Sequence, residues 1–168
     1  MSRARRLKMK KNSSPLDLTG TGYCASFNFR KTARAVTSFY DAALQKSGIR
    51  STQFAILVGV AKNQPVSIGA LANVLVIDGT TLTRSLRLLQ TEGFMAISNR
   101  GAMRQRFLTI TAKGERVLAH SLPAWRKAHE RFVATVGSKY WLDLRKELER
   151  LTRVAVDLEK PQKEVPPL

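Results

Sequence analysis

The chain has 168 residues, and 43% of them are hydrophobic, which is enough for a core and excludes a wholly disordered chain. Its 29 Lys and Arg residues exceed 12 Asp and Glu residues and give a net charge of +17. No apolar run can span a bilayer, and none follows the basic start, so neither a membrane protein nor a secretory signal is predicted. The charge favours a polyanionic partner, and nucleic acid fits better than a membrane because the basic residues are not confined to one helix face.

The sequence offers little for catalysis. A single cysteine, Cys24, excludes an intramolecular disulfide framework and clusters of thiolate ligands, and it fits a reducing cytoplasm. The two histidines, His120 and His129, are nine residues apart on one predicted helix, so we expect surface or interface positions and no shared metal. The central region has only two acids, Asp78 and Glu92, and no glycine-rich phosphate loop or nucleophile motif. We therefore expect no enzyme activity, no metal and no cofactor.

The first third of the chain predicts a basic arm and two helices. Residues 1–22 carry six Lys or Arg in the first eleven positions and are predicted to be disordered; they either contact DNA phosphates or form a solvated tail. A helical pattern then runs from Tyr23 to Leu44 and stops at Gly48. Ser51 is expected to cap a second helix, which Pro65 ends.

Two short helices and a hairpin follow. Ser67 is expected to cap a third helix, and Asp78 a fourth that ends at a left-handed Gly93. The residues expected to face the core are Ile68, Leu71 and Ala72 on the third helix and Leu82, Leu86 and Leu89 on the fourth. Strands are expected at 94–97 and 105–110, around a polar tip at 98–104. The predicted fold class is mainly α with a small β-hairpin wing, that is, a winged helix-turn-helix with added helices.

Two long helices complete the chain. Thr111 is expected to cap the fifth helix, in which Pro123 should cause a kink or a break. Gly137 and Ser138 mark a stop and a restart, and a polar tail covers 161–168. The last helix carries an apolar row at nearly coiled-coil spacing, formed by Leu144, Leu148, Leu151, Ala155 and Leu158.

The polar side of the fourth helix suits the DNA major groove. Arg can donate two hydrogen bonds to guanine, Gln can pair with adenine, and Thr offers a hydroxyl and a methyl group. Arginines on the hairpin could enter a narrow minor groove. The alternatives are an ordinary amphipathic helix and a solvated turn. The predicted DNA-binding residues are Ser67, Thr80, Thr81, Thr83, Arg84, Arg87, Gln90, Arg100, Arg104 and Arg106.

Five segments in order carry a resemblance to the MarR family of bacterial transcriptional regulators. They are TARAVTSFYDAAL, STQFAIL, SIGALANVLVIDGTTLTRSLRLLQTEGFM, ITAKGERVL and LPAWRKA. The resemblance covers about residues 23–158 and implies a base-reading helix at 78–91 and a minor-groove arginine at Arg104. The family wing commonly has Asp two residues before this arginine, where this chain has Ala102.

The resemblance also implies a homodimer whose first and last helices interlock. The apolar rows on the helices at 23–47 and 111–160 support this independently, because the small central part at 49–110 cannot cover them. We treat 23–160 as one winged-helix domain. The predicted interface residues are Val36, Tyr40, Leu144, Leu148, Leu151 and Leu158.

The family resemblance implies control by a small aromatic or lipophilic effector, or by peroxide through a cysteine at the place of Cys24. A thiolate near a helix start and cations would oxidise readily. The alternative, which we favour, is a small buried side chain, since a tyrosine that holds the thiol in that branch is replaced by Phe54. Several aromatic residues could line an effector pocket or simply pack in the core or the dimer: Phe39, Tyr40, Trp125, Phe132 and Trp141.

The leading hypothesis is a homodimeric, sequence-specific regulator of transcription, more specifically a repressor, which binds double-stranded DNA at a pseudo-palindrome and is released by an effector. Two alternatives remain: a peroxide-responsive regulator of the same fold that senses through Cys24, and a nonspecific architectural nucleic-acid-binding protein.

Overall fold

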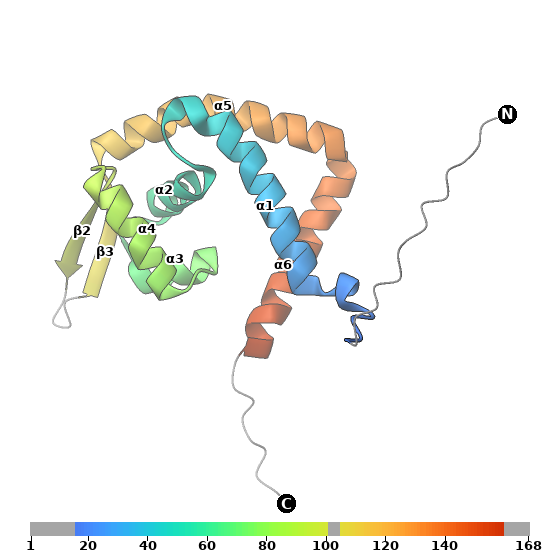
Figure 1. Ribbon diagram of the computed structural model, residues 1–168. Coiled ribbons are helices and arrows are strands. Elements are labelled where there is room, and N and C mark those ends of the chain that lie inside the picture. Colours follow the sequence, from blue (N-terminus) through green and yellow to red (C-terminus); the bar gives the residue numbers. More distant parts are fainter. Residues whose placement is uncertain (1–15, 101–104, 160–168) are drawn as a thin grey trace, which may run out of the picture. The chain divides into compact units, whose positions relative to one another are not determined.

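The computed structural model describes residues 16–100 and 105–159 (Figure 1). Contacts divide the chain into two compact units, Met1–Val36 and Thr37–Leu168, and the boundary lies within the first α-helix. In the first unit, a 3-10 turn, η1 (Thr21–Tyr23), precedes α1 (Ala25–Leu44). Within the described ranges, no helix combines the length and apolar character needed to cross a membrane.

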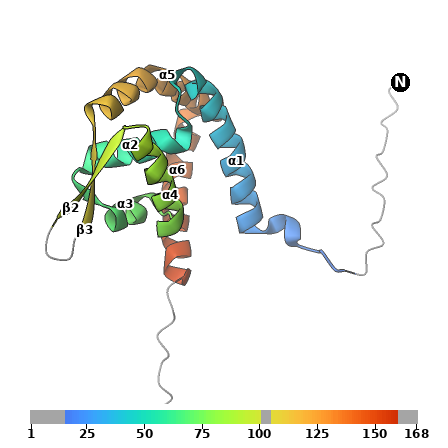
Figure 2. The same cartoon turned by 60° about the vertical axis from the view of Figure 1, so that its left-hand side comes forward.

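The second unit contains a winged arrangement of helices and strands. After α1 come η2 (Gln45–Ser47), α2 (Ser51–Asn63), β1 (Val66–Ser67), α3 (Ile68–Leu75) and α4 (Gly79–Thr91). The hairpin β2 (Met95–Arg100) and β3 (Gln105–Ile110) extends from these helices as a wing (Figures 1 and 2). The strands form an antiparallel sheet in the order β1-β3-β2, with Ile97 opposite Leu108 and Val66 opposite the same leucine. The predicted mainly helical fold with a small hairpin wing is confirmed.

The core of this unit lies between α2, α3, α4 and the sheet. Leu82, Leu86 and Leu89 of α4 are all buried, as their spacing predicted. The other fully enclosed apolar side chains of the described chain are Leu44, Leu57, Val60, Leu71 and Leu108. Burial of one full side-chain face therefore fixes which side of α4 is turned outward.

Helix caps mostly agree with the sequence. The Ser67 Oγ accepts a hydrogen bond from the Ala70 N–H at 3.1 Å, and the Thr111 Oγ1 accepts one from the Gly114 N–H at 3.0 Å. Gly93 has a φ of 72° after α4, a left-handed conformation that glycine adopts without a steric penalty.

The prediction that Ser51 caps α2 is wrong. The N-cap is Arg50, whose backbone N–H donates to the Gln53 Oε1 at 2.8 Å. Ser51 instead donates to the Asp41 Oδ1 from both its Oγ and its N–H, each at 2.7 Å. The carboxylate of Asp41, which belongs to α1, thus accepts the hydrogen bond of a backbone N–H group that would otherwise be unpaired at the start of α2. It also makes an ion pair with Arg50 at 3.3 Å.

The strands differ from the prediction in extent. β2 continues to Arg100, three residues beyond the expected end, because Ser98, Asn99 and Arg100 pair with residues of β3. The expected polar tip is therefore partly strand, and positions 101–104 lie outside the described residues. The two-residue strand β1 was not predicted.

The last two helices, α5 (Ala112–Val136) and α6 (Ser138–Glu159), meet at Gly137, as predicted. α5 is one helix through Pro123, so of the expected kink or break the break is excluded and the kink stays a prediction. α6 has no buried residue, although its apolar row is long.

The start of α5 is attached to the end of α4. The Thr111 Oγ1 donates to the Gly93 carbonyl oxygen at 2.7 Å, and the Thr111 N–H donates to that of Phe94 at 3.1 Å. The Lys113 Nζ donates to the Glu92 carbonyl oxygen at 2.7 Å and lies 5.2 Å from the centroid of the Phe94 ring. Gly114 is buried here, and a Cβ on it would overlap the Phe94 carbonyl oxygen.

Candidate nucleic-acid interface

α4 is anchored by its leucines and presents a polar, positively charged side. Thr80, Arg84 and Arg87 are exposed, at three- and four-residue spacing that places them on one face. Together with Gly79 and the half-buried Thr83 they line one shallow hollow. Neither arginine makes an ion pair with any described residue, so both guanidinium groups can donate to a ligand.

The start of α4 is held by Asp78, as predicted. Its Oδ1 accepts a hydrogen bond from the Thr81 N–H at 2.8 Å. Hydrogen bonds from the side chain and backbone of Thr81 lower the pKa of the Asp78 carboxyl below its ordinary value. The carboxylate is therefore ionised at neutral pH and occupies the free N–H groups that an approaching phosphate would otherwise use.

The threonines of α4 do not all keep their hydroxyl hydrogens available. The Thr83 Oγ1 donates to the Gly79 carbonyl oxygen at 2.7 Å within the helix. Thr83 therefore offers a methyl group and oxygen lone pairs rather than a donor. Thr80 lies on the same outward side and makes no such bond to a described residue.

Gln90 is exposed but lies apart from this hollow. It follows Arg84 by six residues, which places it about 120° further around the helix and about 9 Å along it. Its predicted contact with adenine would need a different part of the duplex from that met by Arg84. The role of Gln90 stays a prediction.

The other predicted DNA contacts lie around the wing. Ser67 is opposite Phe107, the neighbour of exposed Arg106 on β3, so the sheet brings Ser67 and Arg106 to adjacent strands. Arg100 ends β2, opposite Gln105. Arg104 and the departure at Ala102 lie outside the described residues, and their roles stay predictions.

Sequence reasoning did not single out three exposed apolar residues of α3, α4 and the turn between them. Leu88 of α4 is 50% exposed, and Val74 and Val76 near the turn between α3 and α4 are 60% and 57% exposed. Only polar side chains were considered as readers, although apolar groups can contact thymine methyls. A leucine among the outward positions of an amphipathic helix was the available signal.

The predicted interface residues differ in exposure. Leu158 is 78% exposed and Leu151 36%, whereas Val36, Leu144 and Leu148 are half-buried. Tyr40 is already engaged within the chain, because its hydroxyl is hydrogen-bonded to the His129 Nδ1 at 3.0 Å. Burial raises the pKa of the Tyr40 hydroxyl, which keeps it protonated. That these six residues lie in a dimer interface stays a prediction.

Several predicted aromatic residues pack together with a histidine. Trp125 stacks on Phe54 at 5.7 Å and on His129 at 5.1 Å between ring centroids. Trp141 of α6 contacts His129 and Phe132 edge-on. We call Phe39, Tyr40, Phe54, Trp125, His129, Phe132 and Trp141 the aromatic cluster. His129 is half-buried against these rings, so an interface position for it stays a prediction, while His120 is exposed, as predicted.

Cys24 is exposed at the end of η1, so the favoured expectation of a buried side chain is wrong. Its N–H donates to the Thr21 carbonyl oxygen at 3.1 Å, and its own carbonyl accepts from Asn28. A redox role stays a prediction. Among the described residues, no group of three His, Cys, Asp or Glu side chains could hold a metal ion.

Comparison with known proteins finds similar chains among solved structures. No family model and no curated protein matches the sequence. Among solved structures, the Mycobacterium tuberculosis transcriptional regulator MosR in complex with DNA is 29% identical, with a TM-score of 0.74; the match covers 82% of this chain and 99% of that one.

Two further structures share the fold at lower identity. A transcriptional regulator of the MarR family from Rhodococcus is 16% identical, with a TM-score of 0.65 over 79% of this chain and 96% of that one. Bordetella bronchiseptica BpsR, whose DNA binding is regulated by 6-hydroxynicotinic acid, is 14% identical, with a TM-score of 0.69 over 83% and 99%. With the winged arrangement and the exposed face of α4, these similarities identify the fold as that of the MarR family of winged helix-turn-helix transcriptional regulators.

Proposed function

We propose that the protein is a homodimeric repressor that binds a pseudo-palindromic DNA operator and is released by a small aromatic or lipophilic effector. The observation that carries the proposal is the outward face of α4. Its arginines are exposed and lack acidic partners among the described residues, while its opposite side is locked in the core. A rigid helix that presents unpaired arginines is suited to reading guanine in the major groove.

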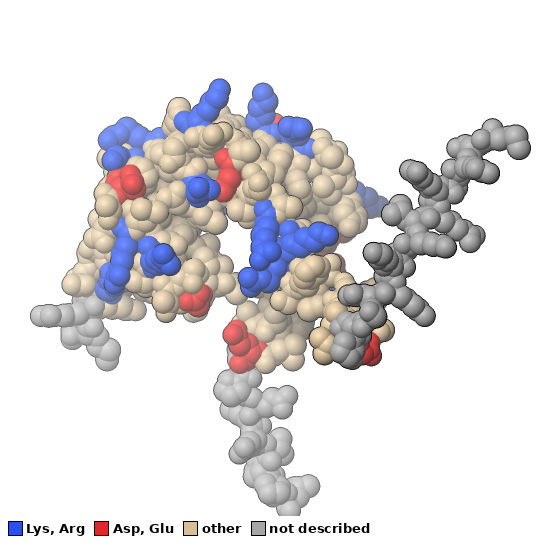
Figure 3. Space-filling view, in the orientation of Figure 1, with Lys and Arg blue, Asp and Glu red and all other residues tan. Residues whose placement is uncertain are grey.

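The charge distribution supports DNA as the ligand. Figure 3 shows many more Lys and Arg than Asp and Glu on the visible face. The acids of α6 are largely matched internally, as in the ion pairs Arg150–Glu147 at 2.8 Å and Lys146–Asp143 at 3.6 Å. The excess positive charge is therefore carried elsewhere, including α4. Affinity should fall steeply with salt as phosphate contacts release counterions.

Dimer formation is supported by α6. The helix buries no residue within the chain, yet Leu151, Val154 and Leu158 are exposed on it. Apolar surface of this kind marks an interface in the absence of another cover. Two-fold symmetry then places two α4 helices on successive turns of DNA.

The test is selection of bound duplexes from a random pool by the purified, reduced protein. We expect an enriched pseudo-palindrome with half-sites about 10 bp apart. Recovery of DNA without a motif would contradict base readout and support the architectural alternative. Transcription from a promoter that contains the selected site should then decrease when the protein is added, and an increase would contradict repression.

A further inference from the structure

α5 carries basic side chains along one side. Lys113, Arg116, Lys127 and Arg131 are all exposed, and we call these four residues the cationic row. At about 100° per residue they fall within about 60° of one another around the helix, and exposed His120 lies between them. From its first residue to its last the row is about 27 Å long. Figure 3 shows Lys and Arg side chains protruding along the surface over α5.

The charge of the row is not neutralised within the described chain. None of its members makes an ion pair with a described residue. The two acids of α5, Glu115 and Glu130, lie near Arg126, on average about 100° around the helix from the row. Lys127 and Arg131 are four residues apart, a spacing at which like charges repel each other. A bound polyanion would relieve that repulsion.

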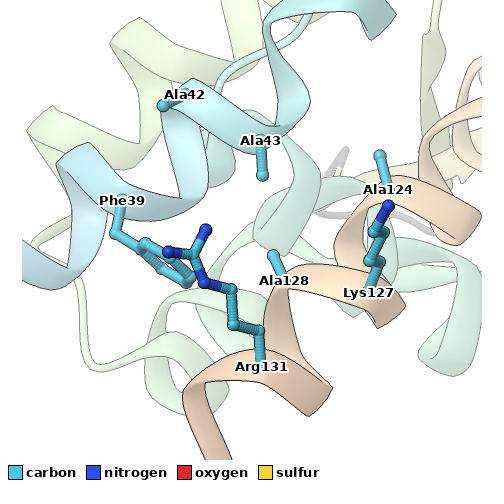
Figure 4. A pocket seen from close by; sticks show the side chains of 7 residues that line it. All are labelled: Phe39, Ala42, Ala43, Ala124, Lys127, Ala128 and Arg131. Carbon is cyan, nitrogen blue, oxygen red and sulfur yellow. The ribbon is translucent and has the colours of Figure 1, made fainter. Parts of the chain in front are cut away.

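The cations near the middle of α5 are accessible from the side as well as from above. A groove with a volume of about 390 Å³ lies between α1 and α5, beside Lys127 and Arg131. Figure 4 shows both side chains extending from α5 at the edge of this groove. Its other lining residues are alanines, including Ala124 and Ala128, together with Phe39. Small neighbours of this kind leave the charged groups free to meet a large ligand.

The surroundings of the row favour phosphates over a protein or a membrane. Within α5, all of which the structure describes, no large apolar side chain is exposed. Protein interfaces depend on buried aromatic or apolar anchors, and helices that lie on membranes insert an apolar face. Contact with a DNA backbone needs cations alone. A duplex carries one phosphate charge per about 1.7 Å of its axis, so the row matches a stretch with about 16 phosphates.

The row lies away from the outward face of α4. α4 packs against α3 and β2, whereas α5 packs against α2. Figures 1 and 2 show α5 on the opposite side of α2 from α3. The two basic surfaces therefore point away from the same core in different directions. A duplex held by α4 would leave the row free.

We propose that the cationic row binds the phosphate backbone of a second DNA duplex without reading its bases. This deepens the proposed function and rests on it in one respect, because α4 is taken to hold the first duplex. The protein would then join two DNA segments. Binding to the row itself needs no operator and can be measured separately.

Two triple variants of the full chain remove equal charge. The row variant is Arg116→Gln/Lys127→Gln/Arg131→Gln. Lys113 is kept, because its Nζ donates to the Glu92 carbonyl oxygen and lies over the Phe94 ring. The control variant changes three exposed cations elsewhere that make no ion pair with a described residue: Arg126→Gln/Lys139→Gln/Arg153→Gln. Circular dichroism checks that both fold.

The first measurement is fluorescence anisotropy with a labelled duplex of random sequence over a range of salt concentrations. Each protein also carries Arg84→Gln/Arg87→Gln, which removes the basic face of α4. We expect the row variant to bind about tenfold more weakly than its parent, with a salt slope smaller by about 2.7, the value for three phosphate contacts. The control variant should change much less. Equal losses in the two variants would overturn the proposal.

The second measurement tests whether two duplexes bind at once, with α4 intact. Protein held on an immobilised selected duplex should capture a labelled random duplex, and the row variant should bind the first duplex but not capture the second. Equal capture by both would overturn the proposal. If no motif is selected but the row variant fails in the anisotropy measurement, the row is supported and base reading by α4 fails. If a motif is selected and the row variant matches the control, the repressor proposal stands and the row fails.

Other partners are outcomes of the same design. Poly-glutamate represents an acidic protein, and vesicles with phosphatidylserine represent an anionic membrane. Binding to either that depends on the row and is tighter than binding to the duplex would overturn the proposal. Sedimentation of the row variant completes the set. A changed assembly state with unchanged duplex binding would make the row an interface between copies and would also overturn it.

Discussion

The winged part of the molecule and the α6 helix differ in how far they bury their apolar side chains. α4 buries all three of its inward leucines against α2, α3 and the sheet, so its outward side is free for a ligand. α6 carries an apolar row of similar length, of which Leu144 and Leu148 are only half-buried and Leu151 and Leu158 are exposed. The first region encloses its own apolar side chains, whereas the second leaves part of its apolar row exposed, which the proposed dimer would cover. Stability should therefore reside in the winged part and assembly in α6.

The largest expected effect tests the winged core. Leu86→Ala removes a side chain that is 1% exposed and should lower the free energy of unfolding by about 2–5 kcal/mol, because it leaves a cavity. Chemical denaturation measures this. The matched control is Leu88→Ala on the same helix, where the side chain is 50% exposed and a much smaller loss is expected. Equal losses would contradict the separation of α4 into an inner and an outer side.

The next test addresses α6. Leu151→Asp should raise the dimer dissociation constant at least a hundredfold, about 2.7 kcal/mol, since it places a charge in an apolar contact. Sedimentation measures the dimer. Leu142→Asp is the control, because nine residues, or two and a half turns, place Leu142 on the opposite side of the helix. A dimer that survives Leu151→Asp would remove this row from the interface.

Arg84→Ala probes the outward side of α4. We expect a loss of about 1–3 kcal/mol in binding to the selected duplex and relaxed preference at one base pair, with folding and assembly intact. Fluorescence anisotropy across single-base variants of the duplex gives both quantities. Arg153→Ala removes the same charge from α6 and should cost less, without a change in base preference.

The junction of α1 and α2 gives a smaller, pH-dependent effect. The hydrogen bond from the Ser51 side chain lowers the pKa of the Asp41 carboxyl. Burial opposes this shift, and the Ser51 N–H and Arg50 add to it. The contribution of the Asp41 carboxylate to the free energy of unfolding should be complete above the unfolded-state pKa of about 3.9. It should be lost as pH falls through the lower pKa of the folded state. Asp41→Asn should therefore cost about 1 kcal/mol near neutrality.

Denaturation at several pH values checks this sign. The difference between wild type and Asp41→Asn should shrink below about pH 4, where the wild-type carboxyl becomes protonated. Asp143→Asn, in an exposed ion pair on α6, should cost less at every pH. A difference that grows on acidification would refute the role given to the Asp41 carboxylate.

The smallest expected effect is a gain. Val76 adopts a φ of 49°, a left-handed conformation that is costly for a β-branched side chain. Val76→Gly should raise the free energy of unfolding by about 0.5–1 kcal/mol. The substitution removes the backbone strain, and the greater conformational entropy of glycine in the unfolded chain offsets part of that gain. Val74→Gly, in the right-handed helix α3, should have the opposite sign. Thermal melting of the pair shows whether the sign reverses.

Local chemistry made much of the fold predictable. Asp78, Thr111 and Gly93 were identified as helix boundaries because their capping groups act within a few residues of the chain. Ser51 was misassigned because its partner, Asp41, is ten residues away on another helix. β1 was missed because a two-residue strand has no periodicity. The groove lined by Phe39, Ala128 and Arg131 could not be predicted, because it depends on which helices cross, and spacing along one helix does not report that.

The attachment of α5 to the end of α4 has a mechanical consequence. Three hydrogen bonds join the start of α5 to Glu92, Gly93 and Phe94, and Gly114 leaves no gap for sliding. α5 is an unbroken helix of 25 residues, about 37 Å long. Over that length a tilt of a few degrees becomes a displacement of ångströms at the far end. The connection at Thr111 is therefore rigid, and a small rotation of α5 would change the orientation of the wing and of α4 together.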